Sequence, residues 1–307
     1  MKIVKEAYLI MAHNNWDMVR KLILAIDNVD NDIFLHINLL SDMPSKEYFE
    51  KDVLHSKIFY IERKPVYWGD YTFSKVIFMF FKDAISKEKG YQYFHILSGS
   101  DLLIKKAGEL KSFLAINLYN NNSKRLKTNY ITYHIPKDKI ECFPVAEYNL
   151  FVKHWRNHNG VLRKTAKGTA LLLNYMQSLI GINRMKSIGM QLYKGDSFFS
   201  VSDEFVRYAL NYEGWAYEHF GKKTFGADEF VFQTIAMNSK FSESIYDKAG
   251  ENSHPNLRHI DFARGTPYVW KMNDYDELKN TNDFFARKFD ATIDGQIINT
   301  IYEDITK

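Results

Sequence analysis

The stretch Ala7-Tyr8-Leu9-Ile10-Met11-Ala12-His13 is a run of uncharged, mostly apolar residues that stops abruptly at a polar one, and it is the clearest indication of the fold class. A short, continuous apolar run is typical of a strand that is buried on both faces of a sheet. Asn15 follows, a residue type favoured at helix N-caps, and the apolar residues behind it recur at helical spacing. The spacing predicts a helix whose buried face carries Val19, Leu22, Ile23 and Ile26.

The same alternation continues over the first hundred residues. Apolar runs predict strands at 33–37, 58–61 and 93–97, and the segments between them predict a helical turn at 46–52 and a helix at 73–84. This pattern predicts an α/β fold with a mostly parallel central sheet and helices on both faces. Further helices are expected at 169–180 and 230–237. No low-complexity linker interrupts the chain, so we expect residues 1–307 to form a single domain.

Composition excludes several classes of protein. Hydrophobic residues make up 46% of the chain, which is ample for a core and excludes a disordered protein. The 41 Lys and Arg against 37 Asp and Glu leave a net charge of +4, too weak an excess to indicate a nucleic-acid partner. Cys142 is the only cysteine, which excludes an intramolecular disulfide framework. Because no apolar run approaches the roughly 18 residues of a membrane span, we expect a cytoplasmic protein.

Polar residues follow three of the predicted strands where they end. His13 follows the first strand, Asn38 the second, and Ser98-Gly99-Ser100-Asp101 the last. Ligands of open α/β sheets bind at the carboxyl ends of the strands. These residues are therefore candidates for a ligand site.

Two D-x-D triplets, Asp30-Asn31-Asp32 and Asp274-Tyr275-Asp276, have a spacing that can hold a divalent cation against a nucleotide diphosphate. The first triplet precedes a predicted strand and so lies at the wrong edge of the sheet. The second fits the acidic start of a helix. The motifs of phosphate loops and zinc proteases are absent from the chain. The sequence therefore disfavours a metal at either triplet.

His154 and His158 are four residues apart, the spacing of a two-histidine metal site on one helix face. No third ligand is evident nearby, and the basic residues of the stretch Lys153–Lys167 would repel a cation. We favour a cationic surface segment, which suits an anionic or sugar acceptor or the anionic headgroups of a membrane.

Asp228 and Glu229 follow Phe225-Gly226 at the start of a predicted helix. Acidic residues in the first turn stabilise a helix, and this alone would explain the pair. A carboxylate at a helix start, beside a glycine-containing loop, can also face a cleft as a general base. Arg264 and Lys288, taken singly, read as ordinary surface cations.

Seven strings together resemble one family, in the same order and over about residues 5–292. The family is that of the core-2/I-branching enzymes, inverting β-1,6-N-acetylglucosaminyltransferases grouped with peptide O-xylosyltransferases in glycosyltransferase family fourteen. The strings are Ala7–His13, Trp68-Gly69, Leu97–Asp101, Gly195–Val201 with Glu204-Phe205-Val206, Ala227–Phe230, Leu257–Phe262 and Phe285–Asp290.

The resemblance implies a GT-A-type fold with a Rossmann-like sheet, in which residues 1–118 bind the nucleotide and residues 119–307 bind the acceptor and carry out catalysis. It implies transfer from a UDP-sugar with inversion and, unusually for this fold, without a metal or other cofactor. Glu229 matches the catalytic base, and Arg264 and Lys288 match the cations that bind the diphosphate. Weaker candidates are His13, Trp68, Ser98 and Asp101 for the sugar nucleotide, and Trp155 and Asp228 for the acceptor.

The chain departs from the animal members, which carry an anchor helix and many disulfide-bonded cysteines. The departure suggests a bacterial member in polysaccharide or glycoconjugate synthesis, at the inner face of the cytoplasmic membrane. Its acceptor would be a glycan or a lipid-linked saccharide, and its donor sugar GlcNAc, with xylose still open. Two alternatives also stay open: an inactive carbohydrate-binding protein of the same fold, and a metal-dependent transferase that uses a D-x-D pair.

Overall fold

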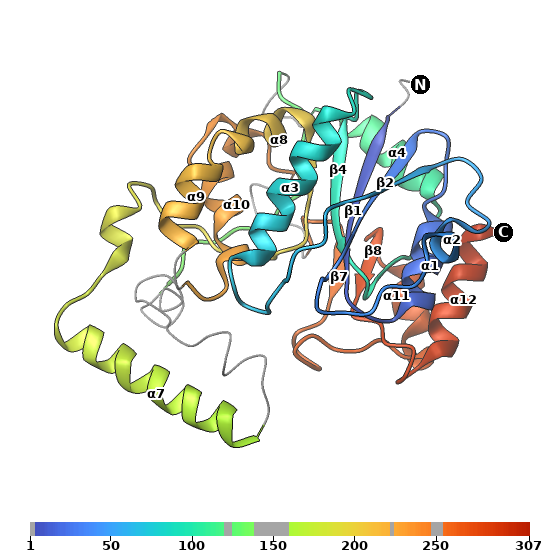
Figure 1. Ribbon diagram of the computed structural model, residues 1–307. Coiled ribbons are helices and arrows are strands. Elements are labelled where there is room, and N and C mark those ends of the chain that lie inside the picture. The colour runs from blue at the N-terminus through green and yellow to red at the C-terminus, as the bar shows by residue number, and fades with distance from the viewer. Residues whose placement is uncertain (1–3, 120–124, 138–159, 222–223, 247–253) are drawn as a thin grey trace.

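The computed structural model describes residues 4–119, 125–137, 160–221, 224–246 and 254–307 (Figure 1). Trp155, His154 and His158 lie outside the described residues, as does the first part of the cationic stretch that the sequence singled out, up to Asn159.

A five-stranded sheet forms the centre of the fold, in the order β3-β2-β1-β4-β6. The parallel strands are β1 (Glu6–Ala12), β2 (Asn31–Ile37), β3 (Lys57–Tyr60) and β4 (Tyr93–Ser98), whereas β6 (Ser200–Ser202) pairs with β4 in the antiparallel direction. Every residue of β1 and β2 is buried, which is why both read as nearly continuous apolar runs. The predicted α/β fold with a mostly parallel sheet is confirmed.

Helices cover both faces of this sheet, as Figure 1 shows. One face carries α3 (Thr72–Ser86), α8 (Asp203–Leu210), α9 (Glu213–Phe220) and α10 (Val231–Met237). The other carries α1 (Trp16–Ala25), α2 (Lys46–Glu50) and α4 (Ala107–Ile116). Successive residues of β1 alternate between the two cores, with Leu9 in the first and Tyr8 and Ile10 in the second. The prediction of helices on both faces is confirmed.

The sequence did not predict the second sheet, which has three short strands in the order β5-β8-β7. β5 (Asp101–Leu103) pairs antiparallel with β8 (Phe285–Arg287), and β8 pairs parallel with β7 (Arg258–Ile260). α11 (Tyr275–Asn280) and α12 (Gly295–Thr306) contribute to the third core cluster, which contains Trp270. Because β5 follows β4 closely, this sheet brings β7 and β8 to the carboxyl end of β4.

Three details differ from the sequence-based predictions. α7 (Gly160–Leu179) begins well before Thr169, because the basic residues read as loop are good helix formers. Asn15 stands at the N-cap of α1, but its backbone is left-handed (φ 55°) and its side chain makes no capping hydrogen bond. The triplet beginning at Asp30 runs into β2 instead of preceding it. The described residues also form short 3-10 helices, η1 (Arg184–Ser187), η2 (Ala227–Glu229), η3 (Lys240–Ser244) and η4 (Met272–Asp274).

Among the described residues, no helix is both long enough and apolar enough to cross a membrane. The division of the chain at residue 118 into a nucleotide-binding half and an acceptor-binding half stays a prediction.

Candidate active site

Glu229 lies at the end of the 3-10 turn η2, and a second loop holds that turn in position. Gly226, whose φ is 66°, begins the turn, and its N–H donates to the carbonyl of Gly69 (2.9 Å). Trp68 packs on Phe225 with 5.6 Å between ring centroids. The loop of Trp68 and Gly69 therefore lies directly against the loop that carries Glu229.

The carboxylate of Glu229 is half-exposed, with 45% of its side chain accessible, and lies 3.4 Å from the ammonium of Lys194. Partial burial raises the pKa of Glu229, the neighbouring charge of Asp228 raises it further, and Lys194 acts in the opposite direction. A carboxylate with a raised pKa that still reaches solvent is a better proton acceptor than an ordinary surface glutamate.

The segment from Lys194 to Ser197 connects this group of carboxylates. The N–H of Gly195 donates to the carbonyl of Glu229 (2.9 Å), and the hydroxyl of Ser197 donates to Asp228 (2.6 Å). Burial raises the pKa of Asp228, and the hydrogen bond from Ser197 opposes this shift. Lys194 and Ser197 were not predicted as site residues from the sequence, although Ser197 lies inside Gly195–Val201, one of the strings that carry the resemblance.

Ser98 and Asp101, at the carboxyl end of β4, are joined by a residue that the sequence analysis also missed. The guanidinium of Arg287 lies 3.1 Å from the carboxylate of Asp101, donates to the hydroxyl of Ser98 (3.3 Å) and lies 3.9 Å from the ring centroid of Phe198. Burial raises the pKa of Asp101, and the charge of Arg287 acts to lower it. The sequence did not point to Arg287, because the resemblance assigned the binding of the diphosphate to the next residue, Lys288.

The positive charge of Lys288, which follows β8, acts on His13, which follows β1. Desolvation lowers the pKa of His13, and the positive charge of Lys288 lowers it further. The backbone of Lys288 is held by Tyr268 and Trp270, through its N–H to the carbonyl of Tyr268 (3.2 Å) and its carbonyl to the N–H of Trp270 (3.0 Å). His13 is thus kept neutral beside a cation at the carboxyl edge of the central sheet.

Arg264 lies in the loop that also contains Tyr268 and Trp270, and its contacts differ from those of Lys288. Its guanidinium lies against the rings of Tyr268 (4.6 Å) and Trp270 (5.0 Å). It also donates to three carboxylates: Asp261, Asp274 (3.1 Å) and Glu277 (2.8 Å). Hydrogen bonds to Asp261 and Glu277 raise the pKa of Arg264, so its positive charge is balanced by neighbouring carboxylates. A diphosphate at Arg264 would have to displace at least one of them.

A cavity of about 440 Å³ extends from the segment of Asp196 to the carboxylates around Arg264. Its lining includes Asp196, Arg258, Asp261 and Glu277. Arg258 is fully buried and donates to the carbonyls of Ile96 (3.1 Å) and Phe199 (2.9 Å), so that it ties β7 to the central sheet. His254 and His259 also line the cavity.

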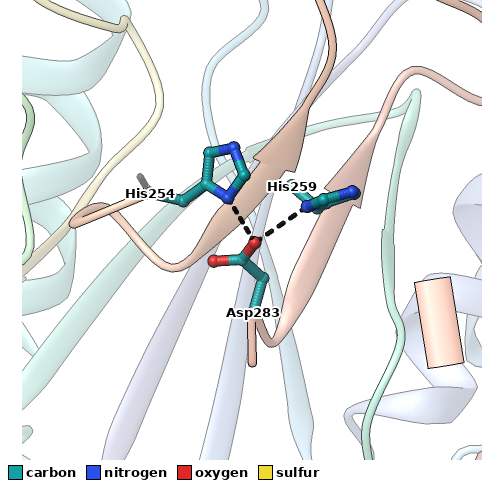
Figure 2. Close-up of side chains that lie close together, drawn as sticks. All are labelled: His254, His259 and Asp283. Atoms are coloured by element: carbon teal, nitrogen blue, oxygen red, sulfur yellow. Dashed lines mark hydrogen bonds and ion pairs between the residues drawn. The ribbon is translucent and has the colours of Figure 1, made fainter. Parts of the chain in front are cut away.

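His254 and His259 converge on one carboxylate oxygen of Asp283, as Figure 2 shows. The Nδ1 atoms of His254 and His259 lie 2.7 Å and 3.0 Å from Oδ2 of Asp283. The sequence analysis did not single out these three residues, since they are spread over three segments and their spacing matches no metal motif.

Three of the four D-x-D carboxylates, those of Asp30, Asp32 and Asp274, pair with cationic side chains. Asp30 pairs with Lys111 (3.1 Å), and Asp32 pairs with Lys89 (2.8 Å) at the amino-terminal edge of the sheet, away from the ends of β1 and β4. Asp274 is bound to Arg264.

Comparison with known families decides the assignment. The family model described as Core-2/I-Branching enzyme matches residues 7–277. The chain belongs to the Core-2/I-Branching enzyme family. The resemblance in the sequence is thereby confirmed, and the chain is a glycosyltransferase of the N-acetylglucosaminyltransferase-like kind.

Two curated relatives carry the same description, β-1,3-galactosyl-O-glycosyl-glycoprotein β-1,6-N-acetylglucosaminyltransferase. The Bos taurus protein is 23% identical over 326 residues, which covers 97% of this chain and 69% of the relative. The Homo sapiens protein is 22% identical over 333 residues, with the same coverage of 97% and 69%.

Solved structures of two glycosyltransferases are also similar to this chain. Core-mannan synthase A from Aspergillus fumigatus, in its Mn/GDP form, has a TM-score of 0.33 and 10% identity, and the match covers 78% of this chain and 71% of that one. Mouse xyloside xylosyltransferase 1, in its apo form, has a TM-score of 0.32 and 10% identity, with coverage of 92% and 96%.

In this member of the Core-2/I-Branching family, the described site residues fall into two groups. Trp68, Asp228 and Glu229 share the loops around Gly226. His13, Ser98, Asp101 and Lys288 lie at the strand ends with Arg287. The loop of Tyr268 and Trp270, which binds the backbone of Lys288, also carries Arg264. The roles of these residues stay predictions.

Proposed function

We propose that this enzyme transfers a sugar from a UDP-sugar donor to a hydroxyl of a glycan acceptor, with inversion and without a metal at the donor. GlcNAc is the favoured sugar, since both curated relatives are N-acetylglucosaminyltransferases, and xylose is the second candidate. The observation that carries the proposal is the half-exposed carboxylate of Glu229, with its raised pKa and its contact to Lys194.

Glu229 is the proposed general base. Displacement at an anomeric carbon requires the attacking hydroxyl to lose its proton as the new bond forms, and a carboxylate within hydrogen-bond distance accepts that proton. Asp228, held by Ser197, and Trp155 are proposed to orient the acceptor. Inversion follows when the hydroxyl attacks from the face opposite the departing UDP.

Arg264 and Lys288 are proposed to stabilise the negative charge that grows on UDP as it leaves. Within the described residues, the ammonium of Lys288 forms no ion pair, so it is available to a phosphate. The carboxylate of Asp261 also accepts from the backbone N–H groups of Ala263 and Arg264, so it stays paired when the guanidinium of Arg264 moves to the diphosphate. Side-chain cations at the diphosphate would supply the charge that a metal ion supplies in other transferases.

His13, Trp68, Ser98 and Asp101 are proposed to contact the sugar nucleotide. Ser98 and Asp101 are linked by Arg287, which adds a cation at the strand ends where ligands of such sheets bind. Trp68 is 61% exposed and presents a flat apolar ring suited to stacking on a sugar or a base.

A screen of UDP-sugars tests the proposal, with release of free sugar by the purified protein in chelator as the readout. We expect slow hydrolysis of a UDP-sugar, UDP-GlcNAc first. Binding of sugars without hydrolysis of any donor would favour the inactive carbohydrate-binding alternative. Hydrolysis that chelator removes and Mn²⁺ restores would favour the metal-dependent alternative.

We further propose that α7 holds the enzyme against an anionic membrane, where a lipid-linked acceptor in bacterial polysaccharide or glycoconjugate synthesis would be presented at the cytoplasmic face. Figure 1 shows α7 standing away from the sheet and its covering helices. It has no acidic residue, and Arg163, Lys164 and Lys167 are exposed. Its exposed apolar residues are Val161, Leu162, Leu171, Leu172, Tyr175, Met176 and Leu179. A helix with exposed basic and apolar residues and no acids is typical of segments that lie in an anionic lipid interface.

Sedimentation with vesicles of anionic and of neutral phospholipid tests this role of α7. We expect binding to anionic vesicles that falls with salt, and loss of that binding in the double variant Leu172→Glu, Met176→Glu. The matched control is Leu54→Glu, an exposed apolar residue outside α7. Equal binding by the double variant, or dimerisation through α7 without vesicle binding, would contradict the proposal.

A further inference from the structure

We propose that His254, His259 and Asp283 form a binding site for a divalent first-row transition-metal ion of the Zn²⁺ class. The ligand atoms of the three side chains lie within 4.8 Å of one another. Figure 2 shows both imidazole rings directed at the same oxygen of Asp283. Small changes in side-chain torsion would bring all three atoms to the roughly 2.0–2.2 Å that Zn²⁺ requires of nitrogen and oxygen ligands.

The fold fixes the positions of His259 and Asp283 before any ion binds. His259 lies in β7 and Asp283 precedes the parallel neighbour β8, so the sheet sets their separation. The ring of His259 stacks on Trp270 (5.0 Å, 23° between planes). The carboxylate of Asp283 accepts a hydrogen bond from the hydroxyl of Thr281 (2.9 Å). A preformed cluster loses little conformational freedom on binding.

The second ring nitrogen of His259 contacts a carboxylate, as the second nitrogen of a metal-bound histidine commonly does. Its Nε2 lies 3.2 Å from the carboxylate of Glu277, while its Nδ1 faces Asp283. When Nε2–H donates to Glu277, the lone pair of Nδ1 points at a carboxylate oxygen, and either a proton or a metal cation between the two atoms relieves their repulsion. A carboxylate on the second nitrogen is the usual outer contact of a metal-bound histidine, because it fixes the tautomer and the ring orientation.

The arrangement favours a metal ion over a proton on each ring. The centroids of His254 and His259 are 4.9 Å apart, so two imidazolium rings would repel each other. A single ion between Nδ1, Nδ1 and Oδ2 would leave both rings neutral. Two imidazoles and one carboxylate suit Zn²⁺, Fe²⁺ or Co²⁺ and disfavour Mg²⁺ and Ca²⁺, which take oxygen ligands.

The site opens into the cavity of about 440 Å³, which His254 and His259 help to line. Three protein ligands with an open position are typical of metal sites that also bind water or an oxygen of a ligand. This site adjoins the proposed donor site, because Glu277 contacts both His259 and Arg264, but none of the three proposed metal ligands is a residue assigned to UDP. Its test measures metal uptake alone, so its failure leaves the glycosyltransferase proposal untouched, and the reverse also holds.

Titration of chelator-treated protein without a histidine tag with Co²⁺ tests the site. We expect visible d–d absorption that saturates at a single ion per chain and that Zn²⁺ abolishes by displacement, whereas Mg²⁺ does not. In the same wild-type protein, ¹⁵N resonances of the imidazole Nδ1 atoms should shift on addition of Zn²⁺. Absence of stoichiometric uptake, or uptake without a change at these nitrogens, would overturn the proposal.

Variants locate the ion. His254→Asn and Asp283→Asn, checked for folding by thermal unfolding, are expected to abolish saturable uptake. Glu277→Gln, which changes the outer partner of His259 and also a carboxylate that binds Arg264, should weaken Co²⁺ binding by roughly 10–100-fold. His55→Ala, an exposed histidine elsewhere, is the matched control and should bind as wild type does. Uptake that persists in folded His254→Asn and Asp283→Asn proteins would exclude this cluster.

Discussion

At the scale of single residues, Glu229 combines what a general base needs. It reaches solvent, its pKa is raised by partial burial and by Asp228, and a loop with fixed backbone contacts holds it. Lys194 offsets part of this rise in the pKa of Glu229. The pKa of this group therefore depends on two identifiable neighbours.

Replacement of Glu229 by Gln removes the proton acceptor and keeps the shape of the side chain. Transfer is expected to fall by about 10²–10⁴-fold, the usual contribution of a positioned base. The affinity for UDP, measured by calorimetry, should stay unchanged, because the carboxylate contributes nothing to the diphosphate. A parallel loss of UDP binding would assign Glu229 a structural role.

The variant Lys194→Met tests the electrostatic environment of Glu229. Lys194 lowers the pKa of Glu229, so its removal raises that pKa. Since the base must be ionised, activity falls as the pH drops through its pKa. The acidic limb of kcat/KM should therefore move to higher pH. Lys240→Met, a surface lysine elsewhere, is the control. Identical pH profiles for Lys194→Met and wild type would contradict this assignment.

At the scale of the elements, the loop of Trp68 and Gly69 positions the turn that carries Glu229. A Cβ atom on Gly69 would lie 2.2 Å from the ring of Phe225, and the φ of Gly69 is 75°. Both the space and the backbone conformation at this position require glycine. Accurate placement of Glu229 thus depends on a residue with no chemistry of its own.

Gly69→Ala is expected to lower the free energy of unfolding by about 1–3 kcal/mol, the cost of a strained backbone position, and to reduce turnover. Urea unfolding and donor hydrolysis measure the two effects. Gly90→Ala is the matched control, because Gly90 has a similar φ of 69° and a Cβ atom there would meet nothing within 4 Å. Full activity in Gly69→Ala would show that the two loops are not coupled.

The elements also show which parts of the fold can be predicted from the sequence alone. Long buried strands such as β1 are visible as apolar runs, and helix faces are visible as periodic spacing. The strands β5, β7 and β8 have three residues each, too few for a pattern, and their partners lie far apart in the chain. The cluster of His254, His259 and Asp283 and the contacts of Arg287 depend on that pairing, so no spacing rule could reveal them.

At the scale of the whole molecule, the second sheet assembles the candidate site. β5 leads from the end of β4 to β8, so Arg287 and Lys288 come to the strand ends that also carry His13 and Ser98. The resemblance predicted Glu229, Arg264 and Lys288, but the three carboxylates around Arg264 could not be predicted, since they come from a loop and two helices that fold together.

The most direct test of the account is the turnover of UDP-sugars in excess chelator, compared between wild type and Lys288→Ala. We propose that the side-chain cations of Arg264 and Lys288 neutralise the departing UDP. The wild type should remain active in chelator, and Lys288→Ala should lose about 10²–10³-fold in rate, as when one charge-stabilising donor is removed. Activity that chelator abolishes and Mn²⁺ restores, or full activity of Lys288→Ala, would contradict it.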